Sequence, residues 1–264
     1  MKNRLIVWSS ALMLALAFAA QGASFRPDND QDRYRERDEI RQTHELASGA
    51  RVEVSGINGK VEIETNFGDT AEIHVVRSAR NRDDLNYRKV IIEYTPNKLV
   101  IRGEDERERG RRRNSPNVRQ EVMLSLPRNI DLSTSGVNGH VKVGEVDGPV
   151  RVSGVNGKVT VDQAVGYSHL SGINGHVTVT IARLGERGIH VSGINGGVEL
   201  RFADELNADL DVTGINGSVR ADVPNVVVQG KLNPHNFHAR IGGGGSRISV
   251  SGVNGGVQLV RSGR

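Results

Sequence analysis

Apolar and polar residues alternate along most of this chain, on either side of a five-residue phrase that occurs seven times. The phrase reads Ser-Gly-Ile-Asn-Gly or a close variant, and its copies begin at Ser55, Ser135, Ser153, Ser171, Ser192, Thr213 and Ser251. Three positions after each asparagine stands a valine, then a polar residue, then a second apolar residue. This period of two is typical of a strand with one buried face. Each repeat therefore predicts a strand, a corner and a second strand.

The spacing of the repeats predicts how these strands are arranged. After the first copy, the asparagines of the phrase are Asn138, Asn156, Asn174, Asn195, Asn216 and Asn254. Most neighbours in this series are about 20 residues apart, a period typical of solenoids and repeat arrays. The gap between the last two is about twice as long, and we expect a degenerate copy in it at Leu232-Asn233.

We predict an all-β fold, a parallel β-solenoid (β-helix) of about 20-residue turns with a β-rich N-terminal part. The alternative is an array of antiparallel hairpins, because Asn-Gly also forms two-residue hairpin turns. The solenoid is favoured because chemically similar columns recur from repeat to repeat, as stacking requires. It also allows the Ile or Val inside the phrase to point inward.

The phrase itself is interpreted as a structural corner. Glycine and asparagine tolerate the left-handed backbone region, and stacked asparagines can form a ladder of amide hydrogen bonds. A ligand-cradling loop is the alternative, but seven equal copies are a poor way to build one asymmetric site. The phrase also lacks the carboxylates of a calcium site. The predicted corner residues are Gly56, Asn58, Gly136, Asn138, Gly154, Asn156, Gly172, Asn174, Gly193, Asn195, Gly214, Asn216, Gly252 and Asn254.

The chain divides into three predicted parts. Residues 1–22 begin with two cations, continue with an apolar run and end in small residues, which is typical of a secretory signal peptide. Residues 23–50 are polar and are predicted to be a mobile leader without a core of its own. Residues 51–264 form the solenoid domain, with a solvated, charged loop insert at 103–117.

Composition narrows the location and the partners. The chain has no cysteine, which excludes disulfides and thiolate metal sites. It has 35 basic and 31 acidic residues; without Lys2 and Arg4 the balance is 33 to 31, or +2, so charge gives no reason to expect nucleic acid. No stretch after the signal is long and apolar enough for a bilayer span. We expect an exported protein of the bacterial periplasm or cell surface, without a stable membrane span after signal cleavage.

Candidate chemistry is sparse. His169 and His190 fall in one outward column on successive turns, and we expect Arg151 and Asp211 to flank them. Two histidines and an aspartate suit a metal, but exposed polar positions on a solenoid carry any soluble residue. We predict no metal, no cofactor and no catalytic residue. The one tryptophan, Trp8, lies in the signal, which weighs against a polysaccharide-cleaving β-helix enzyme with its pair of carboxylates.

The repeated Gly-Ile-Asn followed by Gly-x-Val-x-Val, behind a signal peptide, resembles a bacterial adhesin-like family of unknown function. That family includes the head "GIN" domain of proposed autotransporter adhesins and a related β-strand-repeat domain of envelope proteins. The resemblance covers roughly residues 51–260. It implies an exported, non-enzymatic cell-envelope protein, an adhesin-like scaffold or binding module that uses the outer faces of a β-solenoid.

The resemblance leaves the partner and the role open. The partner is expected to be a protein or an envelope or surface component, and end-to-end self-association is a further mode of contact. Some relatives belong to envelope-stress systems, so a sensing or regulatory protein is one alternative. A carbohydrate-active β-helix enzyme is the other.

Overall fold

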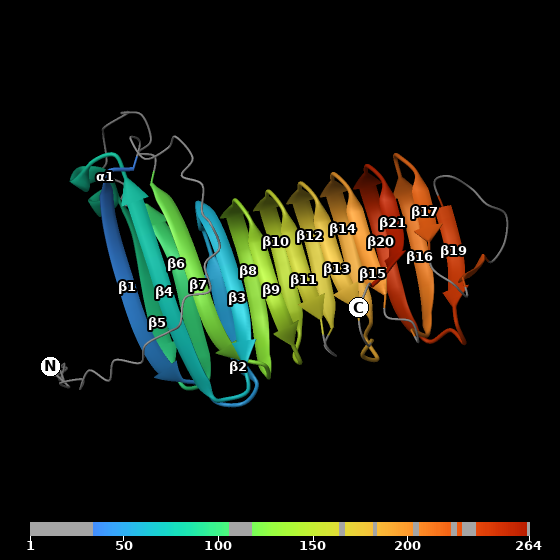
Figure 1. Ribbon diagram of the computed structural model, residues 1–264, viewed down its shortest axis with the longest axis horizontal. Coiled ribbons are helices and arrows are strands. Elements are labelled where there is room, and N and C mark those ends of the chain that lie inside the picture. Colours follow the sequence, from blue (N-terminus) through green and yellow to red (C-terminus); the bar gives the residue numbers. More distant parts are fainter. Residues whose placement is uncertain are drawn as a thin grey trace, which may run out of the picture.

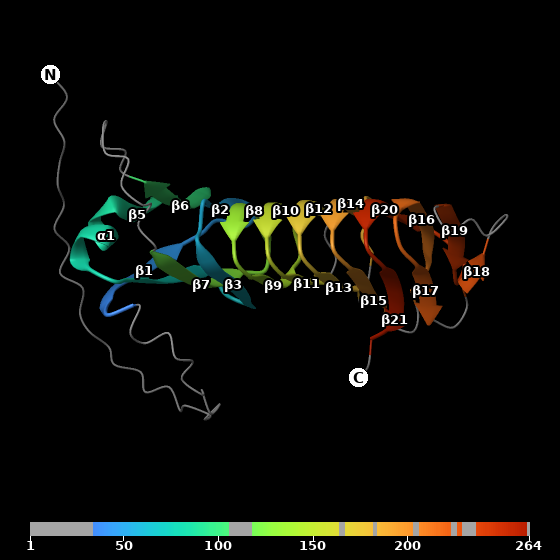
Figure 2. The same cartoon turned by 90° about the horizontal axis from the view of Figure 1, so that it is seen from above.

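The computed structural model describes residues 34–105, 118–163, 167–181, 184–202, 206–222, 226–228 and 236–262. These residues form one elongated stack of coils in which two sheets lie face to face (Figures 1 and 2). The signal peptide predicted for residues 1–22 lies outside the described residues. So does most of the charged insert, because only 103–105 are described, as the end of a strand.

Each coil contributes one strand to each sheet. The strands that lead into the phrase form most of sheet B: β2 (Ala50–Ser55), β8 (Ile130–Asn138), β10 (Val150–Asn156), β12 (Ser168–Asn174), β14 (Ile189–Asn195), β16 (Ala208–Ile215) and β20 (Ser246–Asn254). The strands that follow it form most of sheet A: β3 (Gly59–Asn66), β9 (Val141–Val146), β11 (Val159–Gln163), β13 (Val177–Ile181), β15 (Val198–Phe202), β17 (Val219–Asp222) and β21 (Val257–Arg261).

Neighbouring coils pair in parallel, with equivalent residues side by side. Val155 of β10, for example, lies between Val137 of β8 and Ile173 of β12. The predicted parallel solenoid is therefore confirmed, and the hairpin array is wrong for the repeat. Strand β10 continues through the phrase to Asn156, so the corner that reverses the chain is shorter than the phrase itself.

The space between the sheets is filled by the inward columns. The Ile or Val inside each phrase is at most 1% exposed: Ile57, Val137, Val155, Ile173, Ile194, Ile215 and Val253. The valine three positions after the asparagine is equally buried in six copies, and it is partly exposed only at Val219. Val219 belongs to β17, the last strand of sheet A, where no further coil covers it. Each Å² of apolar surface that is buried along this column contributes about 25 cal/mol to the stability of the stack.

The asparagines form a ladder at the edge where the strands of sheet B end. Each side-chain amide donates to the side-chain oxygen of its neighbour, at 2.9–3.2 Å, in the order Asn216, Asn254, Asn195, Asn174, Asn156, Asn138, Asn58. Asn58 then donates to the backbone oxygen of Val118 at 2.8 Å. Because every donor points the same way, one chain of amide hydrogen bonds runs through all seven coils.

The two glycines of the phrase are needed for different reasons. Gly172 has φ +59°, but a Cβ there would lie no closer than 3.6 Å to the next coil, so only its left-handed backbone favours glycine. Gly175 sits directly on the coil below, and a Cβ there would overlap the carbonyl oxygen of Gly157. The same overlap recurs at the equivalent glycines of the other coils. The second glycine therefore sets the close approach of one coil to the next.

Antiparallel pairing occurs at the N-terminal end of the stack. In sheet A, β7 (Arg119–Pro127) pairs in parallel with β3, and β4 (Thr70–Ala79) pairs antiparallel with β7 and with β1 (Glu36–Glu45). In sheet B, β5 (Arg88–Thr95) and β6 (Lys98–Asp105) form an antiparallel hairpin. The helix α1 (Arg82–Tyr87) is capped by Asn81, whose side-chain oxygen accepts a hydrogen bond from the backbone amide of Asp84 at 2.9 Å. This helix was not expected from the sequence.

The prediction of a mobile leader over residues 23–50 is wrong for Glu36–Glu45. These residues form the edge strand β1, which pairs along its whole length with β4. Ile40 packs against the core, while most of the other side chains of the strand are charged. Charged side chains are common on edge strands because they discourage pairing with another chain. Because of the same charges, the sequence predicted a solvated leader here instead of a strand.

The order of coils at the C-terminal end differs from their order in sequence. Coil β20–β21 lies between β14–β15 and β16–β17, although it is the last of the three in the chain. Beyond β16, sheet B is extended by β19 (Asn236–Ile241) and β18 (Val226–Val228), both antiparallel to their neighbours. The degenerate copy expected at Leu232-Asn233 lies outside the described residues, and the strands on either side of it, β18 and β19, both pair antiparallel in sheet B.

The described part of the chain contains no helix with the length and apolar character that a bilayer span requires.

Candidate functional site

The predicted surface cluster is assembled only in part. Arg151, His169 and His190 lie side by side on β10, β12 and β14, as expected. Asp211 does not join them, because the inserted coil places Ser249 between His190 and Asp211. Asp211 instead contacts His238 at 2.6 Å and Arg247 at 3.0 Å. The expectation that Arg151 and Asp211 flank the two histidines is thus correct for Arg151 and wrong for Asp211.

The two histidines are stacked rather than convergent. Their ring centroids are 5.1 Å apart at an interplanar angle of 15°, and the Tyr167 ring continues the stack 6.4 Å from His169. Burial lowers the pKa of His169 below its usual range, and the neighbouring His190 and Arg151 lower it further. Arg151 is itself paired with Asp131 at 2.5 Å. Among the described residues, no group of three or more His, Asp or Glu side chains converges on one point where a metal ion could bind.

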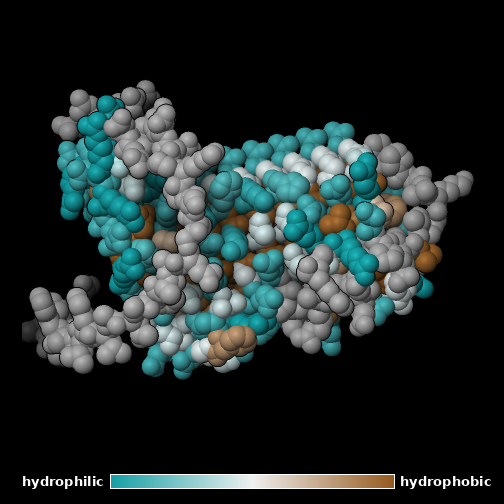
Figure 3. Space-filling view, in the orientation of Figure 1, coloured by the Kyte–Doolittle hydropathy of each residue, from teal (hydrophilic) through white to brown (hydrophobic). Residues whose placement is uncertain are grey.

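The outer face of sheet A is polar and its charges are largely paired. Figure 3 shows this face as mostly hydrophilic, with narrow hydrophobic strips. Glu62 lies between Lys60 and Lys142, and hydrogen bonds from these two lysines lower the pKa of its carboxyl group. Arg201 and His176 have the same effect on the pKa of Glu199. Such pairs hold carboxylates in the ionised form.

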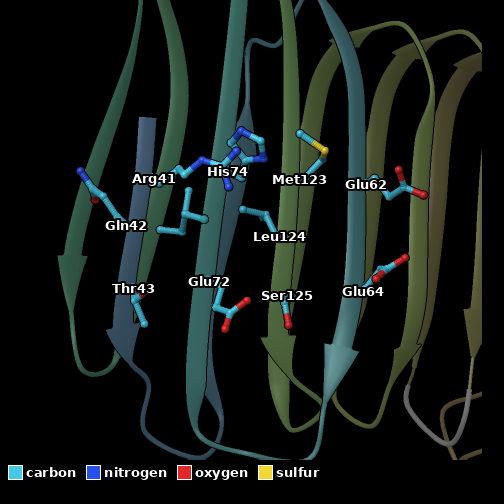
Figure 4. Close-up of a pocket in the computed structure, with 11 residues that line it drawn as sticks. Arg41, Gln42, Thr43, Glu62, Glu64, Glu72, His74, Met123, Leu124 and Ser125 are labelled. Atoms are coloured by element: carbon cyan, nitrogen blue, oxygen red, sulfur yellow. The ribbon is translucent and has the colours of Figure 1, made fainter. Parts of the chain in front are cut away.

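A shallow groove of about 670 Å³ lies on sheet A, across β1, β4, β7 and β3 (Figure 4). Arg41, His74, Met123 and Glu62 line it in one row across the strands, because they are register partners. Glu72, Ser125 and Glu64 form the row below it. The groove therefore brings three carboxylates to one face, and a carbohydrate-active enzyme needs a pair of them.

The groove lacks the other requirement of such an enzyme. A glycoside hydrolase needs one carboxylic acid whose raised pKa keeps it protonated as a proton donor. The pKa of Glu62 moves in the opposite direction, and both of its oxygens face lysines. Glu64 and Glu72 are both exposed to solvent.

The longer connections lie on the edge opposite the asparagine ladder, and they contain two pockets. We call this surface the loop edge; its described residues are Asn66–Asp69, Pro127–Asn129, 147–149, Tyr167 and 184–188. A pocket of about 270 Å³ lies beside Phe67, and one of about 230 Å³ lies beside Tyr167. Asp147 lines both, so the two pockets adjoin.

Each pocket combines an aromatic ring with an arginine. The guanidinium carbon of Arg128 is 5.5 Å from the ring centroid of Phe67, and that of Arg187 is 5.7 Å from the ring centroid of Tyr167. Arg128 is held in place by Glu145 at 2.8 Å and Asp147 at 3.5 Å. Phe67 is 94% exposed, so its ring is presented to solvent on a fixed support.

The loop edge was not predicted from the sequence. Phe67, Tyr167 and Arg187 lie between the recurring columns, in connections of unequal length. The available signal was the difference between repeats. The interval from Asn174 to Asn195 is longer than that from Asn156 to Asn174, which places the extra residues in these connections. The corner glycines and asparagines lie at the other edge and take part in stacking, as described above.

The chain is similar to solved structures of several bacterial proteins. A proposed cell adhesion protein from Clostridium sporogenes is 11% identical, with a TM-score of 0.46 over 86% of this chain and 100% of its own. Proposed adhesins from Bacteroides fragilis and Parabacteroides merdae are 10% and 13% identical, with TM-scores of 0.31 and 0.26. They cover 84% and 85% of this chain and 97% and 96% of their own.

These matches are to proteins of the kind that the Gly-Ile-Asn motif suggests. No protein-family model matches the sequence, and no curated protein matches it. At this level of similarity, what the chain binds has to be inferred from its own residues.

Proposed function

We propose that this protein is an exported, non-enzymatic binding module of a bacterial envelope, with an adhesin-like role. One observation carries the proposal: two pockets, each with an aromatic ring, adjoin on the loop edge, while Glu62 and Glu199 on sheet A are paired with neighbouring cations. A solenoid is a rigid support for such an edge, because every coil is held by its neighbours. Binding residues are commonly found on loops that a rigid scaffold positions.

The proposal is tested by binding to envelope material. The purified protein, labelled at its amino terminus, is incubated with envelope fractions of its source bacterium, and the bound fraction is measured by sedimentation. We expect saturable binding that Phe67→Ala and Tyr167→Ala reduce at least fivefold. Tyr87→Ala is the matched control, because Tyr87 is also partly exposed but ends helix α1, at the edge of the asparagine ladder, where the next residue, Arg88, donates to the backbone oxygen of Gly56. Absence of saturable binding, or equal binding by all variants, would contradict the proposal.

The identity of the envelope component that binds the protein in this experiment distinguishes two roles. Recovery of a structural surface component supports the adhesin-like role. Recovery of a membrane-bound regulator supports the alternative of an envelope-stress sensor.

A carbohydrate-active enzyme remains the second candidate, because the groove on sheet A gathers Glu62, Glu64 and Glu72. The test is release of reducing ends from soluble polysaccharides by the wild-type protein, with Glu64→Gln and Glu72→Gln as paired variants. We expect the wild-type protein to release no more reducing ends than the two variants do. Turnover that either variant abolishes would assign the groove as an active site.

A further inference from the structure

The two pockets of the loop edge lie next to each other along the length of the solenoid. They are formed by connections of different coils: residues 66–69 and 127–129 on one side, 147–149 at the junction, and Tyr167 with 185–187 on the other. The carboxylate of Asp147 lies at the junction. A ligand that fills both pockets is therefore elongated and has at least two similar units.

The size of each pocket limits the unit that it accepts. At about 230 and 270 Å³, both are below the range of roughly 300–1,000 Å³ that is typical for drug-sized ligands. Each has space for one ring-sized group. A folded protein partner needs a larger contact, about 800 Å² per side with an apolar centre. The loop edge instead offers two separate rings among charged and small residues.

The chemistry of each pocket matches a sugar ring. The flat face of an aromatic side chain packs against the C–H face of a pyranose, while carboxylates and guanidinium groups bind its hydroxyls in pairs. Phe67 has Asp69, Arg128 and Asp147 around it. Tyr167 has Asp147, Glu186 and Arg187 around it. Gly148 and Pro149 also line the Tyr167 pocket.

The charges of the two pockets favour a neutral sugar over an anionic one. Arg128 and Arg187 are the cations among the residues that line them, and Asp69, Asp147 and Glu186 are the anions. Glu145 also binds Arg128. The balance is not positive, so neither a sulfated or phosphorylated glycan nor nucleic acid is attracted electrostatically.

We propose that the loop edge binds a neutral oligosaccharide, with one sugar ring on Phe67 and a second on Tyr167. This inference rests on the proposed function as a binding module, and it names the ligand class.

The test is calorimetric titration of the purified protein with neutral hexasaccharides of glucose, mannose and N-acetylglucosamine, and with a heparin hexasaccharide as the anionic probe. We expect at least one neutral hexasaccharide to bind, and its Kd to rise tenfold or more in Phe67→Ala and in Tyr167→Ala. Tyr87→Ala is again the control and should leave Kd unchanged. The corresponding monosaccharides should bind at least tenfold more weakly, because they fill one pocket.

The other possible results of this titration would contradict the neutral saccharide as ligand. If none of the neutral hexasaccharides binds at millimolar concentration, or if binding is the same in all variants, the saccharide proposal is wrong. Binding of the heparin probe alone would replace the neutral ligand by an anionic one. If envelope binding is lost in Phe67→Ala while no saccharide binds, the binding function stands and only the ligand class fails. Thermal unfolding checks the folding of the variants, and the 94% exposure of Phe67 predicts an unchanged Tm for its alanine variant.

Discussion

Asn254 donates its side-chain amide to the side-chain oxygen of Asn195 at 3.0 Å, although the two are far apart in sequence and Asn216 lies between them in the chain. Asn216 in turn donates to Asn254, also at 3.0 Å. The last coil of the chain is thus enclosed between two coils that are consecutive in sequence. The ladder is continuous through all three coils despite this change of order.

Strand β16 is held from both sides, which explains the order of the coils. It pairs with β19 on one edge and β20 on the other, and the run Gly242–Gly245 connects these two strands. The turn therefore passes over the start of β16. There the backbone amide of Gly243 donates to Asn207 at 2.7 Å, and that of Gly245 donates to Asp209 at 3.3 Å.

Engineered disulfides can test the coil order. Ser192 and Ser251 are register partners on neighbouring parallel strands, about 4.8 Å apart, which is within the range that a disulfide bridges. The chain has no cysteine of its own, so the background is clean. We expect Ser192→Cys/Ser251→Cys to form an intramolecular disulfide, detected by mass spectrometry of non-reduced peptides.

The matched control is Ser192→Cys/Thr213→Cys. Thr213 is the register partner of Ser251 on the far side, so it lies two strand spacings, about 9.6 Å, from Ser192. This pair should stay reduced. Efficient cross-linking of the control pair would show that the coils stack in sequence order.

The two glycines of one corner should differ in their tolerance of alanine. At Gly172, alanine meets only the cost of a left-handed backbone, about 1–2 kcal/mol. At Gly175, alanine also overlaps the backbone of Gly157 and forces the coils apart. We expect Gly175→Ala to lower Tm clearly more than Gly172→Ala, as measured by circular dichroism.

A third variant separates backbone conformation from contact. Gly172→Asn should be milder than Gly172→Ala, because asparagine enters the left-handed region more readily. Equal effects of alanine at positions 172 and 175 would contradict the close approach at Gly175.

The asparagine ladder predicts that position along the stack matters. Asn174 both donates to Asn156 and accepts from Asn195, whereas Asn216, at the end of the ladder, donates to Asn254. With about 1 kcal/mol for each hydrogen bond, Asn174→Ala should cost about 2 kcal/mol of unfolding free energy, and Asn216→Ala about 1 kcal/mol. Urea unfolding measures both. A larger loss at the end than in the middle would rule out the ladder as the source of the effect.

His169 predicts a loss of stability in mild acid. Burial, His190 and Arg151 lower its pKa in the folded protein below the unfolded value near 6.5. As the pH falls, the unfolded chain therefore takes up the proton before the folded protein does. The contribution of His169 to the free energy of unfolding is fully present above about pH 6.5 and is lost as the pH falls through the folded pKa. The groups that face His169 are Arg151, His190 and Tyr167, and Asp131 is already engaged by Arg151.

The measurement is Tm as a function of pH for the wild type and His169→Gln. We expect the wild type to lose more Tm between pH 7 and pH 5 than the variant does. His44→Gln is the control, because His44 lies on β1, far from the stacked pair. Parallel pH profiles for the wild type and His169→Gln would contradict the prediction.

Period-two alternation and the regular recurrence of the phrase were sufficient to predict the parallel coils and the inward columns. Each of these depends on local backbone preference or on a pattern that recurs within one coil. The pairing of His169 with His190 follows from the same register. Strand β1 was missed because its many charges reflect its place at the edge of a sheet, a property that depends on its neighbours and not on its own sequence.

The sequence by itself determined the structure of one coil, because glycine, asparagine and alternating β-branched residues set the corner and the buried face locally. It could not determine which coil stacks on which, because every coil presents the same ladder and the same columns to its neighbour. Tertiary structure decided that order through the enclosure of β16 by β19 and β20, which separated Asp211 from His190. It also brought Phe67 and Tyr167, which are far apart in the chain, to adjoining pockets on one edge.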